Sequence, residues 1–399
     1  MSDSSISLSS PVLMRRPWQA VTAMFLLNGA LFGAWASRIP TVAERFSLDA
    51  GTLGFVLLAL AFGAILSFPL AGGLCERYGA AFVTRTIAVL YALSLVGIAA
   101  APALPLLVLA IILFGAAHGS MDVAMNAWAA EVEREIGASV MSGFHAMFSL
   151  GAGLGAASGF AAVRFGLDVS AHFLLLSLVL LTLALLLSNI PGTNRKPVAA
   201  VASSSVFLSV PRGTLFFVGM VAFGISLGEG AMADWSAIYL VSVAGSPLDT
   251  AALGYACFST MMVVLRLLGD RVVSLLGPVV TVRVSAVCAM SGVALAVIAA
   301  TPLWSLCGFA LMGAGYAIVM PLVFSRAAND PDTPPGPAIA GVATLAYGGM
   351  LLGPPVIGFL AELIGLRAAF LLLAALALLT ALLAGHLRLE QSEGQGRRG

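Results

Sequence analysis

Charged residues are scarce in this sequence. Of its 399 residues, only 9% are Asp, Glu, Lys or Arg, and 60% are hydrophobic. Soluble proteins average about 25% charged residues, so this chain cannot cover a water-facing surface. That shortage excludes a soluble enzyme, a nucleic-acid-binding protein and a disordered protein. The net charge of +1 gives no information about binding partners.

Paired cysteines and metal-binding motifs are also missing. The four cysteines are Cys75, Cys257, Cys288 and Cys307. They form no C-x-x-C pair and have no histidine at metal-ligand spacing, so we expect no metal and no cofactor. The sequence has no H-E-x-x-H or Gly-x-Ser-x-Gly motif, and His145 with Ser149 is the nearest approach to a catalytic pair. We therefore expect no enzymatic activity.

Long apolar runs dominate what is present. A helix needs about 20 apolar residues to cross a bilayer core of about 30 Å, whereas the strands of membrane barrels alternate apolar and polar residues. The continuous runs here predict an all-α polytopic membrane protein with twelve transmembrane helices. The first run has no cleavage site after it, which indicates a membrane helix rather than a removable signal. The predicted spans are 18–37, 51–71, 83–101, 105–128, 141–163, 171–190, 214–240, 251–269, 282–300, 303–324, 338–360 and 368–387.

Lysine and arginine predict the orientation of these spans. With the N-terminus inside, fourteen of them fall in cytoplasmic segments and four on the opposite side, and Arg266 lies within a span. Both termini are therefore predicted to be cytoplasmic. Between the sixth and seventh spans lies a Pro-, Ser- and Lys-containing segment of the kind that forms flexible linkers. The predicted organisation is a tail (1–16), a six-helix half (17–190), a linker (191–213), a second half (214–388) and a tail (389–399).

The two halves repeat each other at a shift of about 199 residues. A shift of 200 pairs Leu27–Trp35 with Leu227–Trp235, and a shift of 198 pairs Gly79 with Gly277 and Gly115 with Gly313. Between these matches the shift falls to 194, which predicts a shorter eighth helix followed by a longer loop. Six-helix halves related by pseudo-two-fold symmetry are a transporter architecture, with the substrate site near the middle of the membrane.

The loop after the second span carries a recognisable motif. It reads Gly72-x-x-x-Glu76-Arg77-x-Gly79, and Gly269-Asp270-Arg271 repeats it in the second half. This resembles the cytoplasmic-loop signature of the major facilitator superfamily. The stretches "MDVAMNAW" and "EGAMADW" resemble a group of bacterial inner-membrane permeases distantly similar to fucose permeases. The resemblance implies location in the bacterial inner membrane and a central cavity lined by the first, fourth, seventh and tenth helices.

Two departures from the superfamily pattern affect the expected mechanism. Its motif Arg-x-x-Gln-Gly corresponds here to Gly115-Ala-Ala-His118-Gly119, which lacks the arginine linked to proton coupling. The antiporter-like run Gly349-x-x-x-Gly353-Pro354-Pro355 lies in the eleventh span, not in the fifth where the superfamily has it. We therefore look elsewhere for coupling groups and draw no exporter assignment from this run.

Polar residues within the 105–128 span form the main candidate cluster. His118, Asp122 and Asn126 are spaced i, i+4, i+8 and so share a face of the helix. Charges near the middle of a membrane cost at least about 2.5–3.5 kcal/mol, so they normally face a cavity or a partner. A histidine beside a carboxylate is suited to handling protons. We expect Asp122 to bind a proton or substrate with His118 assisting. The alternative is a structural cluster, and for Asn126 we favour a helix–helix hydrogen bond.

Charged residues elsewhere suggest a second binding group and two gates. Glu229 lies among small residues with no cation expected near it, so it is a proton or substrate site or else one half of a static ion pair. We expect Asp234 to pair with Arg38 as an external latch. Arg266 precedes Asp270 by four residues and is expected to pair with it, although a guanidinium would also suit an anionic substrate. The gating candidates are Arg38, Asp234, Glu76, Arg77, Arg266, Asp270 and Arg271, of which the loop arginines could instead signal topology alone.

The superfamily resemblance adds further cavity candidates. It places Asn28, Trp35 and Tyr316 toward the cavity and Trp235 at its outer mouth, although such aromatic side chains are as often packing or interface anchors. His145 precedes a glycine-rich run that indicates a close helix contact. The candidate substrate- or proton-binding residues are Asp122, Glu229, His118, Asn126, Asn28, Trp35, Tyr316 and His145.

These features together predict a proton-coupled secondary transporter that moves a small polar solute by alternating access. Its expected partners are that solute, protons and the lipid bilayer, with a monomer as the working unit. A proton-driven exporter of drugs or metabolites is the main alternative. A membrane sensor that binds without transporting is less expected, because its loops and tails of about 20 residues leave no room for a signalling domain.

Overall fold

The computed structural model describes residues 11–137, 140–189 and 211–388. Over these ranges the chain is helical and contains no strand, and twelve helices are long and apolar enough to cross a membrane. The predicted fold class, a polytopic all-α protein with twelve membrane helices, is confirmed. Most of the predicted linker 191–213, most of the tail 1–16 and the tail 389–399 lie outside the described residues.

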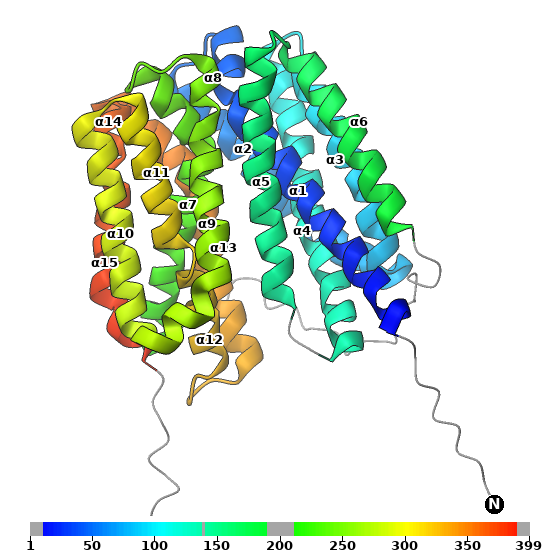
Figure 1. Cartoon of the computed structure of the whole chain (residues 1–399), viewed down its shortest axis with the longest axis vertical. Coiled ribbons are helices and arrows are strands. Elements are labelled where there is room, and N and C mark those ends of the chain that lie inside the picture. The colour runs from blue at the N-terminus through cyan, green and yellow to red at the C-terminus, as the bar shows by residue number, and fades with distance from the viewer. Residues whose placement is uncertain (1–10, 138–139, 190–210, 389–399) are drawn as a thin grey trace, which may run out of the picture. The chain divides into compact units, whose positions relative to one another are not determined.

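Figure 1 shows the helices in chain order. The first six are α1 (Pro11–Arg45), α2 (Ala50–Tyr78), α3 (Ala80–Ala100), α4 (Leu104–Ile136), α5 (Met141–Arg164) and α6 (Val169–Ser188). The second series comprises α7 (Thr214–Ser242), α8 (Leu248–Ala251), α9 (Leu253–Leu276), α10 (Pro278–Ala299), α11 (Pro302–Tyr316), α12 (Val319–Ala328), α13 (Pro335–Ile364), α14 (Leu366–Ala369), α15 (Leu371–Leu383) and the 3₁₀ turn η1 (Ala384–Leu387). The eighth, tenth and twelfth crossings are each assembled from shorter pieces.

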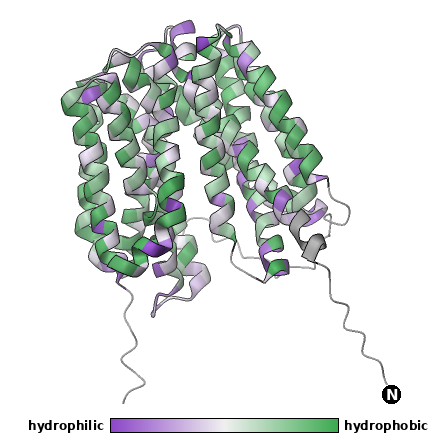
Figure 2. Cartoon of the chain, viewed as in Figure 1, coloured by the Kyte–Doolittle hydropathy of each residue, from purple (hydrophilic) through white to green (hydrophobic). Residues whose placement is uncertain are grey.

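Large apolar side chains project outward from the helices. Leu66, Leu186 and Leu275 are 61%, 71% and 83% exposed, and Figure 2 shows apolar residues along most of the length of the helices. Such surfaces would be costly in water but suit contact with lipid. Helices are also the form in which a chain satisfies its own backbone hydrogen bonds where water is absent.

Equivalent close contacts in the two halves confirm the internal repeat. A side chain on Gly115 of α4 would collide with the Leu60 carbonyl of α2, and one on Gly313 of α11 would collide with the Phe258 carbonyl of α9. Both members of this contact recur at the same shift of 198 residues. Small residues let membrane helices approach closely, and here glycines at equivalent positions of the two halves allow that approach.

The turns after α2 and α9 repeat as well. Gly79 has φ 88° before α3, and Gly277 has φ 74° before α10. The shorter eighth helix expected from the local shift of 194 is wrong, because the second and eighth crossings are both 29 residues long. Four residues make about one helical turn, so Asp270 and Arg271 lie one turn further inside their helix than Glu76 and Arg77 do in theirs.

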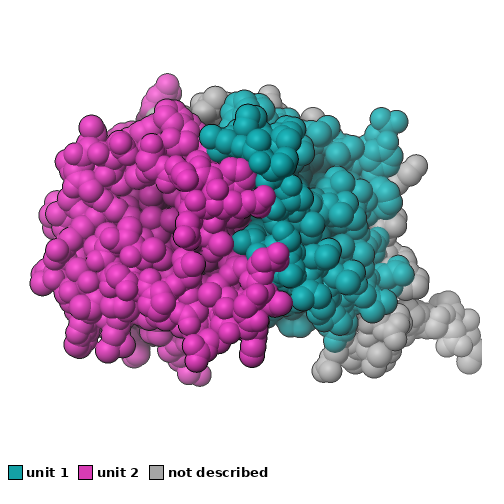
Figure 3. All heavy atoms as spheres, turned by 90° about the horizontal axis from the view of Figure 1, so that it is seen from above, with its two compact units in different colours: residues 1–32, 60–152, 169–199 teal, residues 33–59, 153–168, 200–399 magenta. Residues whose placement is uncertain are grey.

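By their internal contacts the residues form two compact units, shown in two colours in Figure 3. One comprises 1–32, 60–152 and 169–199, and the other comprises 33–59, 153–168 and 200–399. The boundary therefore cuts through α1, α2 and α5. The division at the sequence repeat, 17–190 and 214–388, stays a prediction.

Contacts within the second unit explain why its boundary departs from the repeat. A Cβ on Gly54 of α2 would lie 3.3 Å from the Cα of Gly358 in α13. The rings of Phe55 and Phe359 meet edge to face one residue further along, 4.9 Å apart. The N-terminal part of α2 is thus packed on a helix of the second repeat.

The repeated turn glycines generate a stability prediction. With φ near 80° and ψ of 141° or 162°, Gly79 and Gly277 occupy a backbone region that side chains rarely adopt, which costs of order 1–3 kcal/mol. Gly79→Ala and Gly277→Ala should each lower the free energy of unfolding by about that amount. Denaturant unfolding of the purified protein measures it.

Gly73 supplies the matched control for these turns. It is an exposed helical residue of α2, and a Cβ added to it would have no other atom within 4 Å. Gly73→Ala should leave stability unchanged or raise it by up to about 1 kcal/mol. Equal effects of all three substitutions would contradict the assignment of strain to the turns.

Candidate functional site

An ion pair within the membrane helices lies at the centre of the candidate site. The Nη2 atom of Arg266 on α9 lies 3.5 Å from Oε1 of Glu229 on α7, and the two side chains are 18% and 30% exposed. Two sequence predictions are thereby wrong, since Arg266 does not pair with Asp270 and Glu229 does have a cation. Asp270 is exposed six residues before the end of α9 and can be hydrated, whereas the less exposed Glu229 has more need of a counter-charge.

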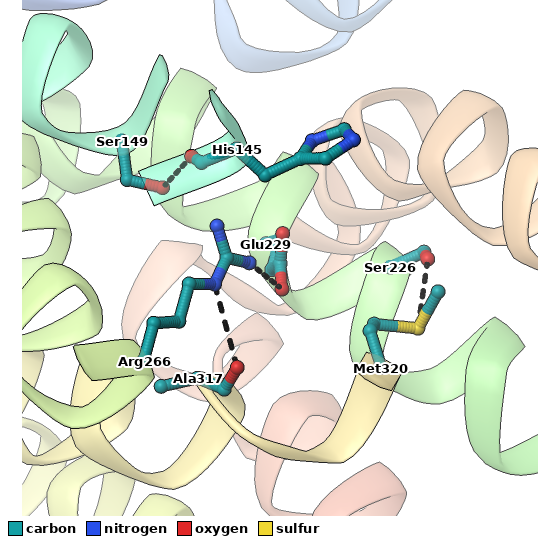
Figure 4. Close-up of polar contacts among 7 residues, drawn as sticks. All are labelled: His145, Ser149, Ser226, Glu229, Arg266, Ala317 and Met320. Atoms are coloured by element: carbon teal, nitrogen blue, oxygen red, sulfur yellow. Dashed lines mark hydrogen bonds and ion pairs between the residues drawn. The ribbon is translucent and has the colours of Figure 1, made fainter. Parts of the chain in front are cut away.

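A break in the tenth crossing supplies the second partner of Arg266. Between α11 and α12 the helix is interrupted at Ala317 and Ile318. Pro321 has no N–H and its ring obstructs the carbonyl four residues before it, which is that of Ala317. The freed carbonyl accepts a hydrogen bond from Nε of Arg266 at 3.4 Å, and Figure 4 shows Arg266 between Glu229 and Ala317.

Other polar groups gather around this pair. Gly228 has no side chain, and a Cβ there would lie 2.5 Å from the hydroxyl oxygen of Tyr316, so the phenol packs directly on the α7 backbone beside Glu229. The Ser226 hydroxyl is 4.0 Å from the sulfur of Met320 (Figure 4). Oε1 of Glu229 is buried and accepts no hydrogen bond in the part of the chain that the structure describes. The carboxylate is therefore held mainly by the charge of Arg266.

A separate network surrounds His118 on α4. Its Nδ1 lies 3.0 Å from the Tyr91 hydroxyl and 3.1 Å from Oδ1 of Asn28, while Phe32 stacks on the ring at 4.9 Å. In this amide orientation Asn28 donates to the sulfur of Met125, so its oxygen accepts from Nδ1. His118 is thus bound by an amide and a phenol rather than by the carboxylate of Asp122, and the proton-handling roles expected for the two residues stay predictions.

Asp122 has a partner on its own helix. The side-chain nitrogen of Asn126 donates to Oδ1 of Asp122 at 3.1 Å and to the Asp122 carbonyl at 2.8 Å. The helix–helix hydrogen bond predicted for Asn126 is therefore wrong, since a side chain one turn later reaches the same face. Asp122 is partly exposed, and among the described residues no cation pairs with it.

The predicted external latch is not formed. Arg38 is buried and donates from Nη2 to the Leu167 carbonyl at 2.7 Å. Asp234 is also buried, and its Oδ1 accepts no hydrogen bond from any residue in the described ranges. No ion pair joins Arg38 to Asp234 over these residues, because the guanidinium is directed to the turn after α5.

The loop-motif residues lie on exposed surface within the last two turns of α2 and α9. Glu76, Arg77, Asp270 and Arg271 are all exposed, and the Arg77 guanidinium lies over the Tyr78 ring, 5.2 Å from its centroid. Within the described ranges none of the four makes the ion pair expected across helices. Hydration makes such pairs weak, and their gating role stays a prediction.

The aromatic candidates differ in position. Trp35 and Tyr316 are buried, at 0% and 1% exposure, and the roles expected for them stay predictions. Trp235 is fully buried and donates from Nε1 to the Pro354 carbonyl at 3.1 Å, and its expected place at an outer mouth stays a prediction. A backbone carbonyl has two lone pairs, so one within a helix can accept this additional donor.

His145 on α5 is exposed, and its ring meets Phe25 edge to face at 5.4 Å. The Ser149 hydroxyl donates to the main-chain carbonyl of His145 at 3.2 Å (Figure 4), not to its imidazole. The contact is thus an ordinary helix back-bond rather than a nucleophile–base pair. A substrate role for His145 stays a prediction.

Three participants were not found from the sequence. Tyr91 and Phe32 hold His118, and nothing in their local spacing marked them. The third participant is the Ala317 carbonyl. Pro321 was the available signal for it, because a proline inside a membrane helix frees the carbonyl four residues before it. The pattern of polar side chains could not indicate it, because the group belongs to the backbone of an alanine.

Comparison with known proteins places the chain among transporters. Residues 20–348 match the Major Facilitator Superfamily. The protein named "Uncharacterized transporter y4wD", of Sinorhizobium fredii, is 46% identical over 94% of this chain and 100% of its own. An uncharacterized MFS-type transporter of Yersinia pestis is 34% identical over 87% of this chain and 89% of its own.

A solved structure agrees in fold. The D-xylose-proton symporter superimposes with a TM-score of 0.70 at 17% identity, over 94% of this chain and 97% of its own. None of these similar proteins is named as a fucose permease, so that narrower resemblance stays a prediction. The family match, the two relatives and the twelve membrane helices show that the chain belongs to the Major Facilitator Superfamily and is a multi-pass membrane transporter of that type.

Proposed function

We propose that the protein is a proton-coupled secondary transporter that moves a small polar solute by alternating access across a bacterial inner membrane. The observation that carries this proposal is the presence of Asp122, Glu229 and Arg266 within membrane-crossing helices. Each ionised group at such a depth costs at least about 2.5–3.5 kcal/mol, so charges there are normally tied to function. The proposal includes cytoplasmic termini and a monomeric working unit.

Asp122 is the first proton-binding group in this proposal. Its carboxylate is held by the neutral amide of Asn126, which stabilises but does not neutralise it. Binding a proton removes the charge, and releasing the proton restores it. A conformation in which Asp122 is hydrated therefore favours the charged form, and one in which water is excluded favours the neutral form.

Glu229 is the second group, and its response is tied to helix packing. A proton on Glu229 removes its attraction for Arg266, while Arg266 keeps its hydrogen bond to Ala317. The contact between α7 and α9 then weakens, while the contact between α9 and the break between α11 and α12 is kept. Protonation thus changes the relative stability of two arrangements of these helices, which is what coupling requires.

The polar solute is inferred from the groups that surround these charges. Near Glu229 stand the Tyr316 phenol and the Ala317 carbonyl, and hydrogen-bonding groups of this kind suit a hydroxylated molecule. A protein of the same fold named D-xylose-proton symporter agrees with such a pairing of solute and proton.

Reconstitution in liposomes tests the proposal. Purified protein is supplied with labelled sugars, polyols, nucleosides and organic acids while a proton gradient is imposed. A gradient of one pH unit should sustain about tenfold accumulation for one proton per solute, because both correspond to about 1.4 kcal/mol. Accumulation that persists after a protonophore collapses the gradient would contradict proton coupling.

Asp122→Asn should remove coupling without preventing insertion. The amide is nearly isosteric but takes up no proton, so accumulation should fall toward an inside-to-outside ratio of one while downhill exchange continues. Asp332→Asn, at an exposed loop position, serves as the control and should keep the wild-type ratio. Full accumulation by the Asp122 variant would remove this residue from the mechanism.

The Glu229–Arg266 pair should show energetic coupling. Either Glu229→Gln or Arg266→Gln leaves one charge without its partner, and breaking a buried pair costs about 3–5 kcal/mol; partial exposure reduces this, so we expect about 1–3 kcal/mol. The double variant should be more stable than the sum of the singles predicts. Denaturant unfolding of all four proteins measures the coupling, and strict additivity would show that the two charges do not interact.

A further inference from the structure

We propose that Arg266 binds the carboxylate of a small hydroxy acid, and that Glu229 occupies the guanidinium when no substrate is present. This inference rests on the proposed function, because it names the substrate class for the same site. All of the residues that carry it belong to the second compact unit.

The ion pair is loose, which is the first argument. Charge-assisted N–H···O contacts are usually about 2.7–2.9 Å, whereas Arg266 and Glu229 are 3.5 Å apart through a single oxygen. That oxygen accepts no hydrogen bond among the described residues. A guanidinium is shaped to bind a carboxylate through two parallel hydrogen bonds. A free substrate carboxylate can adopt that geometry, while Glu229 is restricted by its attachment to α7.

The pair is also accessible, since the side chains are 18% and 30% exposed although they lie in membrane-crossing helices. Next to it stand groups that suit hydroxyls rather than hydrocarbon. The Ala317 carbonyl is only 3.4 Å from Nε and has a second lone pair, and the Tyr316 hydroxyl lies against Gly228. A hydroxylated acid satisfies these groups, and an alkyl acid does not.

Charge balance explains how anion binding and proton binding go together. Among the described residues Arg266 is a cation that acts on Glu229, and Glu229 acts in turn on the phenols of Tyr255 and Tyr316. Tyr255 is also within electrostatic reach of Asp234. When the substrate carboxylate takes the guanidinium, an ionised Glu229 would be left beside a second anion. A proton on Glu229 removes that repulsion, so one anion and one proton enter the site together.

Ligand-induced thermal stabilisation of the purified protein in nanodiscs tests the inference with two matched pairs of probes. Gluconate is compared with sorbitol, and lactate with propane-1,2-diol, so that each pair differs in the carboxylate. Gluconate and lactate should raise the melting temperature and their neutral counterparts should not. Arg266→Gln should abolish the shift, while Arg283→Gln, which removes an exposed arginine of α10, should retain it.

Glu229→Gln should strengthen carboxylate binding, because it removes the side-chain carboxylate that competes with the substrate for the Arg266 guanidinium. If Arg266 is available in one-tenth of wild-type molecules, the apparent Kd for gluconate should fall about tenfold. Should Arg266→Gln fail to fold, the variant with both Glu229→Gln and Arg266→Gln removes the two charges together and should show no carboxylate-specific shift.

Equal stabilisation by a carboxylate and its neutral counterpart, no shift with either carboxylate, or a retained shift in the Arg266 variants would overturn the inference. Proton-driven uptake of a neutral sugar without carboxylate binding would overturn this inference alone. Carboxylate binding together with uptake that ignores the proton gradient would instead overturn the proposed coupling.

Discussion

Arg266 joins three pieces of the membrane domain through one side chain. From α9 it reaches Glu229 on α7 and the Ala317 carbonyl at the break between α11 and α12. In hydrocarbon an unsatisfied carbonyl costs several kcal/mol, so a helix broken by proline needs a donor from elsewhere. The same guanidinium that meets this need also neutralises a carboxylate. The backbone defect and the carboxylate are therefore stabilised together, and neither can be altered without affecting the other.

The two halves of the chain use the repeated fold differently. The contact of Gly115 with Leu60 recurs as that of Gly313 with Phe258, so the packing of the crossings is shared. The polar groups do not repeat. His118 is bound by Tyr91 and Asn28, and its counterpart Tyr316 lies beside Glu229 and a broken helix. Val123 stands where the second half has Pro321, which is why α4 is continuous and the tenth crossing is not.

The sequence predicts the fold well because the bilayer constrains it strongly. Twelve apolar runs and a repeat shift of about 199 residues require that each run be helical and that Gly79 and Gly277 form similar turns, and both are observed. Side-chain partners were predicted poorly. Helical spacing predicts that Arg266 pairs with Asp270, and symmetry predicts that Arg38 pairs with Asp234. Arg266 instead pairs with the less exposed Glu229, and Arg38 donates to a backbone carbonyl. Sequence spacing reports neighbours on one helix, whereas these choices depend on which groups of other helices lack a partner.

The interruption at Ala317 and Ile318 has a mechanical consequence. An unbroken helix transmits a displacement along its whole length, but two segments joined at a residue pair with few internal hydrogen bonds can tilt independently. α11 is anchored by close glycine contacts to α9 and α10, including Gly313 against Phe258 and Gly315 against Ser285. The ten residues of α12 have no glycine, and near their end Arg326 forms a buried ion pair with Asp330. The tenth crossing thus consists of one segment packed closely on α9 and α10 and a second, short segment joined to it only at the break.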